Sequence, residues 1–233
     1  MTLTPIARIR TPFPEKFGIP RQSGLVDALQ AVIVFEKSFQ SPEALRGLED
    51  FSHIWLLWGF SEVNQAPGQW SPTVRPPRLG GNARMGVFAT RSPYRPNPIG
   101  LSAVRLESIE LQTAEGPVLR VRGADLMDGT PIYDIKPYLP YADSRPEALG
   151  GFASRAPEEK LSVYVPRALR DKLSAETWAA LEPVLAQDPR PSYQDDPERV
   201  YGLRFGSADV RFTIAGGVLT VTGVVEASNL LPS

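Results

Sequence analysis

The chain has 233 residues, which allows one large domain or one domain with a smaller appendage. Its 25 lysines and arginines nearly balance 26 aspartates and glutamates, and this excludes both a uniformly basic nucleic-acid-binding coat and an acidic disordered tail. The sequence has no cysteine and one histidine, His53, which excludes disulfides, iron–sulfur clusters, a cysteine nucleophile and a zinc site of the usual ligands, so we expect no metal.

The N-terminal sequence MTLTP lacks a charged segment followed by an apolar stretch, and no apolar run reaches the roughly 18 residues of a membrane-spanning helix. We therefore expect a cytoplasmic protein without contact to a membrane. The 24 prolines and 19 glycines indicate a chain rich in turns, which argues against a bundle of long helices.

The first 144 residues contain short segments rich in β-branched and aromatic residues, separated by glycine and proline. These predicted strands cover residues 31–35, 53–60, 84–89, 102–109, 118–123 and 132–135. Ser41 and Pro42 supply an N-cap and a first helical residue, which predicts a short helix at 41–49. Several short strands favour an antiparallel β-barrel or sandwich over a parallel α/β sheet. No GxGxxG or GxxxxGK[ST] sequence indicates a Rossmann site or a P-loop.

The composition changes after residue 144. Residues 145–160 show no periodicity, and we interpret them as a linker. Helices are predicted at 166–173 and 174–186, and strands at 200–205, 209–214 and 218–226, with a hairpin turn at Gly216-Gly217. The sequence thus predicts a mainly β protein, with a domain at 1–144 and a smaller α+β domain at 161–233.

Arginines are concentrated in one acid-free part of the sequence. Between Val63 and Leu106 there are six arginines and no aspartate or glutamate. Guanidinium groups are planar forks that suit carboxylates and phosphates, so this segment is a candidate binding site for anions. The alternative is an arginine-rich loop that pairs with acids elsewhere in the fold.

The sequence RSPYRPNPIG at 91–100 has three prolines within six positions, at Pro93, Pro96 and Pro98. Proline fixes φ and restricts the preceding residue, so this loop has few conformations and loses little entropy when it binds a ligand. The alternative interpretation is a rigid surface connection or a dimer contact.

Two further segments carry polar groups without periodicity. Residues 16–25 (KFGIPRQSGL) offer an arginine, an amide and backbone groups to a polar ligand, or form an ordinary turn. Residues 125–136 place Asp128-Gly129 in a tight turn, where carboxylates can bind a ribose diol or accept a proton; a simple hairpin is the alternative. His53 lies in the apolar run FSHIWLLW, so we expect it in the core, together with Trp55 and Trp58.

These segments, with GLEDFSHIW at 47–55, closely resemble the TsaA-like family, known as TrmO, of tRNA adenine-N6 methyltransferases. The resemblance rests on RPPRLGGNARMGVFATRSPYRPNPIGLS at 75–102 and DGTPIYDIKPYLPYADS at 128–144, and it spans most of residues 5–144. LAQDPRP at 185–191 and YGLRF at 201–205 are similar to the family's C-terminal domain.

The resemblance implies a small β-barrel that binds S-adenosylmethionine near the interface of a homodimer. It implies methylation at N6 of threonylcarbamoyladenosine beside the anticodon of threonine tRNA. The implied cofactor-binding residues are Arg21, Gln22, Ser23, Gly24, Leu25, Ser61, Glu62, Arg91, Leu101, Asp125 and Asp128. Some relatives have His-Gln in place of Ser61-Glu62, so the role of these two side chains departs from the family pattern.

A sulfonium donor requires neither a metal nor a covalent intermediate, so a chain without cysteine can perform this reaction. The modified base has a ureido-like nitrogen that needs a proton acceptor, and Asp128, Asp134, Glu62 and His53 are the candidates. The expected tRNA-binding residues are Arg75, Arg78, Arg84, Tyr94 and Arg95, with Phe88 a further aromatic that can stack on a base. The alternative function is a non-catalytic regulatory module that binds S-adenosylmethionine or RNA; a hydrolase using His53 is more remote.

Overall fold

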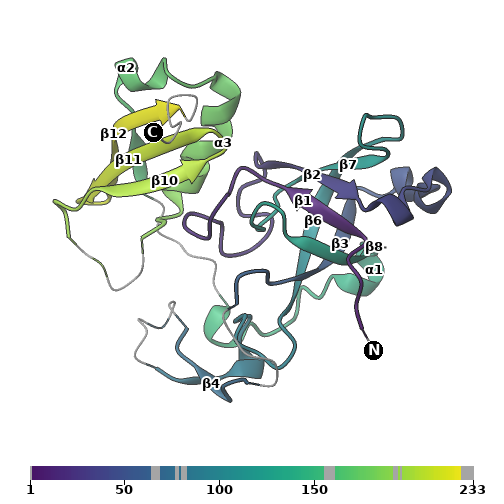
Figure 1. Ribbon diagram of the computed structural model, residues 1–233. Coiled ribbons are helices and arrows are strands. Elements are labelled where there is room, and N and C mark those ends of the chain that lie inside the picture. Colours follow the sequence, from purple (N-terminus) through teal and green to yellow (C-terminus); the bar gives the residue numbers. More distant parts are fainter. Residues whose placement is uncertain are drawn as a thin grey trace.

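The molecule has two lobes, a β-barrel and a smaller sheet with helices, and a short pair of strands lies beside the barrel (Figure 1). The computed structural model describes residues 2–63, 69–76, 79, 83–154, 161–190, 194 and 196–226. Strands predominate in both lobes, so the fold is mainly β, with a barrel followed by an α+β region, as the sequence predicts.

Six strands close the barrel in the order β1-β2-β7-β6-β3-β8, and all neighbours are antiparallel. The strands are β1 (Ala7–Arg10), β2 (Gln30–Phe35), β3 (His53–Gly59), β6 (Ile99–Glu110), β7 (Val118–Arg122) and β8 (Pro131–Pro137). The predicted strands at 31–35, 53–60, 102–109, 118–123 and 132–135 are confirmed, while β1 was not predicted.

The interior of the barrel is filled by alternate residues of each strand. On β3, Ile54, Leu56 and Trp58 are buried, so the intervening residues His53, Trp55 and Leu57 belong to the outer face. The expectation of a buried His53 is wrong: this residue is exposed at the start of the strand, because the apolar run alternates between the two faces.

The predicted strand at 84–89 is also wrong. Only Met85–Gly86 is extended, as β5, and it pairs with β4 (Thr73–Val74) to form a two-stranded ribbon. The next residues form a 3₁₀ helix, η5 (Val87–Ala89), in which Thr90 N–H donates to the Val87 carbonyl at 3.1 Å. Arg75 and Arg84, which directly adjoin these two strands, thus lie outside the barrel.

No single helix covers residues 41–49. This segment forms two 3₁₀ helices, η2 (Pro42–Leu45) and η3 (Leu48–Asp50), because Gly47 between them has φ +84°. Other short helices are η1 (Lys37–Phe39), α1 (Pro140–Asp143) and η6 (Gly151–Ala153). Within the described part of the chain, no helix combines the length and the apolar character needed to span a bilayer.

The second lobe is a four-stranded sheet in the order β10-β11-β12-β9. Its elements are β9 (Ser162–Tyr164), α2 (Arg167–Arg170), α3 (Ala175–Ala186), β10 (Tyr201–Phe205), β11 (Ala208–Ala215) and β12 (Val218–Glu226). Ser174 caps α3 by accepting from Thr177 N–H, and Gly216 and Gly217 both have positive φ in the hairpin turn, as predicted. The predicted helix at 166–173 shortens to α2, and β9, which pairs in parallel with β12, was not predicted.

Asp128-Gly129 forms the expected tight turn, with φ +73° at Gly129 and a hydrogen bond from Thr130 N–H to the Met127 carbonyl at 3.2 Å. The turn does not close a hairpin, however. β7 pairs with β2 and β6, whereas β8 pairs with β1 and β3, so the segment between β7 and β8 crosses the barrel end.

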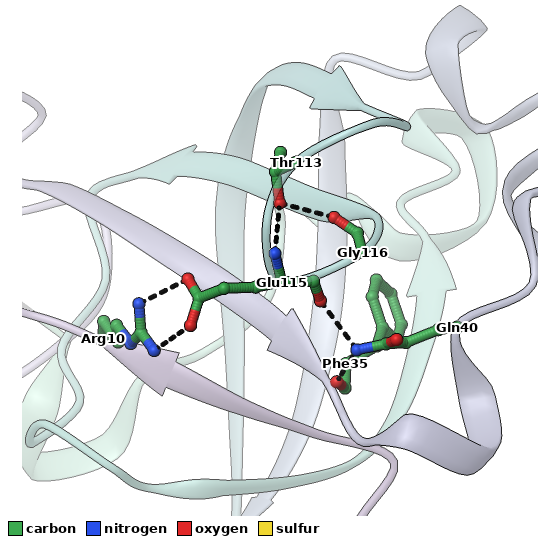
Figure 2. A network of polar contacts seen from close by, with 6 residues as sticks. All are labelled: Arg10, Phe35, Gln40, Thr113, Glu115 and Gly116. Atoms are coloured by element: carbon green, nitrogen blue, oxygen red, sulfur yellow. Dashed lines mark hydrogen bonds and ion pairs between the residues drawn. The ribbon is translucent and has the colours of Figure 1, made fainter.

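A polar network ties the β6–β7 hairpin to the N-terminal strands (Figure 2). Arg10 forms a bidentate ion pair with Glu115, and Gln40 Nε2 donates to the carbonyls of Phe35 at 3.0 Å and Glu115 at 2.7 Å. A Cβ added to Gly116 would lie 2.7 Å from Gln40 Cδ, so the hairpin turn requires glycine there. The network fixes a hairpin turn that contains none of the predicted site residues.

Candidate functional site

A buried chain of hydrogen bonds leads from the barrel interior to Asp125. Trp58 Nε1 on β3 donates to Ser102 Oγ on β6 at 3.0 Å, and Ser102 Oγ donates to Asp125 Oδ1 at 2.6 Å. Ser102 is a polar residue at an inward position of β6, only 1% exposed. Each polar group in this series is the hydrogen-bond partner of the next. The series therefore holds the carboxyl group of Asp125 in a fixed orientation.

Burial raises the pKa of Asp125 above the usual carboxyl value. The Ser102 hydrogen bond, the Arg91 charge and backbone N–H groups act in the opposite direction, but burial dominates. The site therefore contains a partly desolvated carboxyl group close to a guanidinium, an arrangement typical of binding and catalytic sites.

The loop at residues 21–25 closes over this carboxyl group. Gly24 N–H donates to the Gly123 carbonyl at 2.9 Å, and Arg91 Nη1 donates to Gln22 Oε1. A Cβ added to Gly123, which has φ +74°, would lie 3.3 Å from the Gly24 backbone, so the two backbones approach closely. The loop, the proline-rich segment and the end of β7 thus meet, as the motifs predict.

The remaining predicted cofactor residues lie just after β3, on β6 and on the loop at residues 21–25, and most of them are exposed. Glu62 follows β3, and its carboxylate lies 3.6 Å from Lys16 Nζ, which also donates to the Glu62 carbonyl. Leu101 precedes Ser102 on β6 and faces outward, with 54% of its surface exposed. Arg21 and Ser61 are exposed, and Leu25 is half-buried.

The predicted proton acceptors are spread over the barrel. Asp128 Oδ1 accepts from Thr11 N–H at 3.0 Å, and the side chain is exposed. Asp134 pairs with Lys136 at 2.8 Å and lies opposite Leu57, on the outer face that also carries His53. Glu62, the fourth candidate, is exposed after β3. Only Asp128 shares a segment with Asp125, so the structure does not gather the four candidates.

The arginines expected to bind tRNA divide into two groups. Arg75 and Arg84 are exposed on the ribbon, and Arg84 Nη1 lies 3.4 Å from Thr73 Oγ1. Arg95 instead donates to the carbonyls of Val87 at 3.2 Å and Thr90 at 2.7 Å, which stabilises the loop internally. Tyr94 is 53% exposed, and Arg78 lies outside the described residues.

An exposed aromatic pair comes from the segments that flank this ribbon, before β4 and after β5. The rings of Trp70 and Phe88 are 5.9 Å apart with an interplanar angle of 32°, and their exposed fractions are 45% and 76%. No sequence motif singles out Trp70 or Ser102, although strand alternation alone places Ser102 at an inward position between Gly100 and Val104. Exposed aromatic rings beside arginines form a surface on which nucleobases can stack.

The donor set fits an organic zwitterion. Arg91 suits a carboxylate, while Asp125 and the backbone groups of residues 22–24 suit an ammonium or ribose hydroxyls. Among the described residues, no group of three or more His, Cys, Asp or Glu side chains could hold a metal ion. A separate cleft of about 340 Å³ between the lobes, lined by Gln30, Glu176 and Phe205 among others, contains no predicted site residue.

The chain is similar to known proteins over almost its whole length. The tRNA-methyltransferase O N-terminal domain matches residues 8–144, and the TrmO C-terminal domain matches residues 158–227. The chain is 42% identical to the tRNA (adenine(37)-N6)-methyltransferase of Escherichia coli K12, over 90% of this chain and 91% of that protein. It is 43% identical to the putative S-adenosylmethionine-dependent methyltransferase RcsF of Pseudomonas aeruginosa, over 91% of each. A crystal structure of TrmO from P. aeruginosa superimposes with a TM-score of 0.79 at 36% identity, covering 97% of this chain and 98% of that one.

Proposed function

Because this chain belongs to the TrmO family of tRNA methyltransferases, we propose that it transfers a methyl group from S-adenosylmethionine to N6 of threonylcarbamoyladenosine 37 in threonine tRNA. The class of activity, methylation of tRNA adenosine 37 at N6, follows from family membership. The threonylcarbamoyl group, the choice of threonine tRNA and the in-line course of transfer are our proposal. The observation that carries the proposal is the junction of Gln22, Arg91 and Asp125.

In the proposed complex, S-adenosylmethionine supplies an electrophilic methyl group on a sulfonium sulfur. Arg91, held by Gln22, binds the carboxylate of the cofactor. Asp125, oriented by Ser102, accepts from its ammonium or ribose hydroxyls. Backbone groups of residues 21–25 line the same site, Ser61 and Glu62 border it, and Leu101 adds apolar contact.

The protein's main contribution to the rate is alignment. In-line displacement needs the nucleophile, the carbon and the leaving sulfur collinear at near-attack distance, and rigid groups maintain this geometry. The ureido-like nitrogen must also lose its proton. We propose Asp128 as the acceptor, because Thr11 N–H fixes one of its oxygens, the side chain is exposed, and it lies three residues after Asp125. Asp134 and His53 lie on the outer barrel face and have no part in this proposal.

The ribbon and the proline-rich loop form the proposed tRNA surface. An anticodon loop is single-stranded, and its bases can be splayed out and stacked on aromatic rings. Trp70, Phe88 and Tyr94 provide exposed rings, and Arg75 and Arg84 provide exposed positive charge. Arg78 joins this set on sequence alone, and Arg95 supports the loop from within.

We further propose a cytoplasmic homodimer. The exposed apolar side chains of Ile99 and Leu101 lie at the start of β6, next to proposed cofactor residues in the sequence, and are suited to contact a second copy. Residues 1–144 form the proposed catalytic domain, 145–160 the linker and 161–233 a supporting domain that takes part in tRNA binding.

The deciding experiment is nucleoside mass spectrometry of threonine tRNA isolated without the methyl mark, before and after incubation with the protein and S-adenosylmethionine. We expect the mass of threonylcarbamoyladenosine to rise by one methyl group. The same tRNA without the threonylcarbamoyl group should remain unmethylated; equal methylation of both would contradict the proposed substrate. Cofactor binding without methylation would favour a regulatory module.

A further inference from the structure

The loop that carries the proposed cofactor residues is anchored in the core of the other lobe. Residues 11–29 leave β1, reach toward the second lobe and return to β2 (Figure 1). Phe13, Val26 and Leu29 are 0%, 2% and 1% exposed, and they belong to the same apolar cluster as Leu203 and Phe205 of β10. Both arms of the loop therefore pack on the C-terminal sheet and not in the barrel core.

The first arm makes specific contacts with β10 and the turn after it. The rings of Phe13 and Phe205 meet edge to face, 5.5 Å apart at 85°. Gly206 N–H donates to the Pro12 carbonyl at 2.7 Å. Gly18 has φ +85°, and a Cβ there would lie 2.2 Å from Leu203 Cδ1, so the loop backbone is pressed against this side chain.

The tip of the loop contacts the barrel. Gly24 bonds to Gly123, and Gln22 accepts from Arg91. The arms are held by both lobes: their apolar side chains pack on the C-terminal sheet, while the Phe13 carbonyl accepts from Asp128 N–H at 2.8 Å and the Leu29 carbonyl accepts from Gly123 N–H at 2.9 Å. The position of residues 21–24 relative to Asp125 therefore depends on the seating of the first arm on Leu203 and Phe205 as well as on these bonds to the barrel.

We propose that the C-terminal lobe positions the cofactor site, with Gly18, Leu203 and Phe205 acting as positioning residues. This inference rests on the proposed binding of S-adenosylmethionine at the loop tip. A loop held in its binding conformation loses less conformational entropy when the ligand binds, so loosening its arms weakens the affinity without removing any contact to the ligand.

The test is a set of glycine and leucine variants, measured by calorimetry with S-adenosylmethionine. Gly18→Ala should raise the Kd by about tenfold, because the loop must shift away from Leu203. Gly47→Ala is the matched control: Gly47 has φ +84° and no atom within 4 Å of an added Cβ, so it introduces similar backbone strain elsewhere. This control should stay within about twofold of the natural protein, as expected for a site remote from the ligand.

The double variant Gly18→Ala with Leu203→Val removes the clashing Cδ1 atom and should recover most of the lost affinity. In steady-state kinetics, Gly18→Ala should raise the KM for S-adenosylmethionine and leave the KM for tRNA nearly unchanged. A folded Gly18→Ala protein with natural affinity would overturn the inference, as would a double variant that binds as weakly as the single one.

If Gly18→Ala does not fold, Phe205→Leu provides the measurement, because it removes the edge-to-face contact and keeps apolar volume. Phe205→Leu should also raise the Kd, and unchanged affinity would overturn the inference.

Arg91→Ala separates the positioning role of the C-terminal lobe from the proposed cofactor site itself. If it binds S-adenosylmethionine as the natural protein does, the proposed site is at fault; if it binds weakly while Gly18→Ala is unaffected, only the positioning role fails.

Discussion

Ser102 Oγ donates a hydrogen bond to the carboxyl group of Asp125 across the end of the barrel, 2.6 Å away, and Trp58 Nε1 donates to the same hydroxyl. This contact connects the interior of the barrel to the site, because Ser102 is buried and Asp125 borders the loop that closes over it. The carboxyl group is thus held by the core but adjacent to Arg91.

Asp125→Asn should raise the melting temperature at neutral pH and weaken the binding of S-adenosylmethionine. Burial raises the pKa of Asp125, so between the ordinary carboxyl pKa and the raised one the folded state binds more protons than the unfolded state. The stability contributed by this group therefore falls as the pH rises through that window. The melting temperatures of the natural protein and of Asp125→Asn should converge below this pH window and differ above it. Equal melting temperatures at all pH values would contradict the desolvation of Asp125.

Arg91→Ala should weaken S-adenosylmethionine binding by about tenfold or more, the effect of one lost hydrogen bond to a charged group. Arg46 provides a control, since it is an exposed arginine paired with Glu43 on a 3₁₀ helix that carries no site residue. Calorimetry on Arg91→Ala and Arg46→Ala should show a loss only in the first. Equal affinity of the two variants would remove the carboxylate-binding role of Arg91.

Arg78→Ala and Arg84→Ala should each reduce tRNA affinity and flatten its dependence on salt, by about one unit in the slope of log K against log salt. Arg95→Ala should behave differently, because its guanidinium is bonded to the Val87 and Thr90 carbonyls. We expect it to lower the melting temperature. Filter-binding titrations at several salt concentrations measure the tRNA affinity of each variant and its salt dependence. An unchanged slope for Arg84→Ala would exclude a phosphate contact at this residue.

Phe88→Ala and Trp70→Ala should weaken tRNA binding by about 1–3 kcal/mol each if a base stacks on the pair. Both rings are exposed, so the cost in folding stability should be small. Calorimetry with S-adenosylmethionine should give the natural affinity for both variants, while tRNA titrations detect the loss. Full tRNA affinity in the double variant would show that the aromatic pair does not contact RNA.

Local patterns in the sequence predict most strands, but they do not always predict which residues of a strand face the core. The run at 53–60 was identified as a strand from its apolar and aromatic residues, yet its alternation exposes His53. β9 escaped prediction because three residues, Ser162–Tyr164, become a strand only by pairing with β12, more than fifty residues later in the chain. Pairing over such a distance leaves no local signal in a short segment.

Several segments that the motifs single out are in contact in the structure, but the motifs do not assign every side chain. Gln22, Gly24, Arg91 and Asp125 meet as the resemblance implies. In the sequence, nothing distinguishes Arg95 from the other arginines expected to bind tRNA. Only the fold shows that its guanidinium donates to the carbonyls of Val87 and Thr90. The contact of Gly18 with Leu203 joins residues 185 positions apart and could not be read from either segment alone.

The packing of residues 11–29 also bears on where this protein can be divided. A chain cut after residue 144 follows the boundary seen in the sequence, but it would leave Phe13, Val26 and Leu29 facing water on the isolated barrel. Such a fragment should aggregate when expressed alone, and replacing these three side chains with polar ones should restore its solubility.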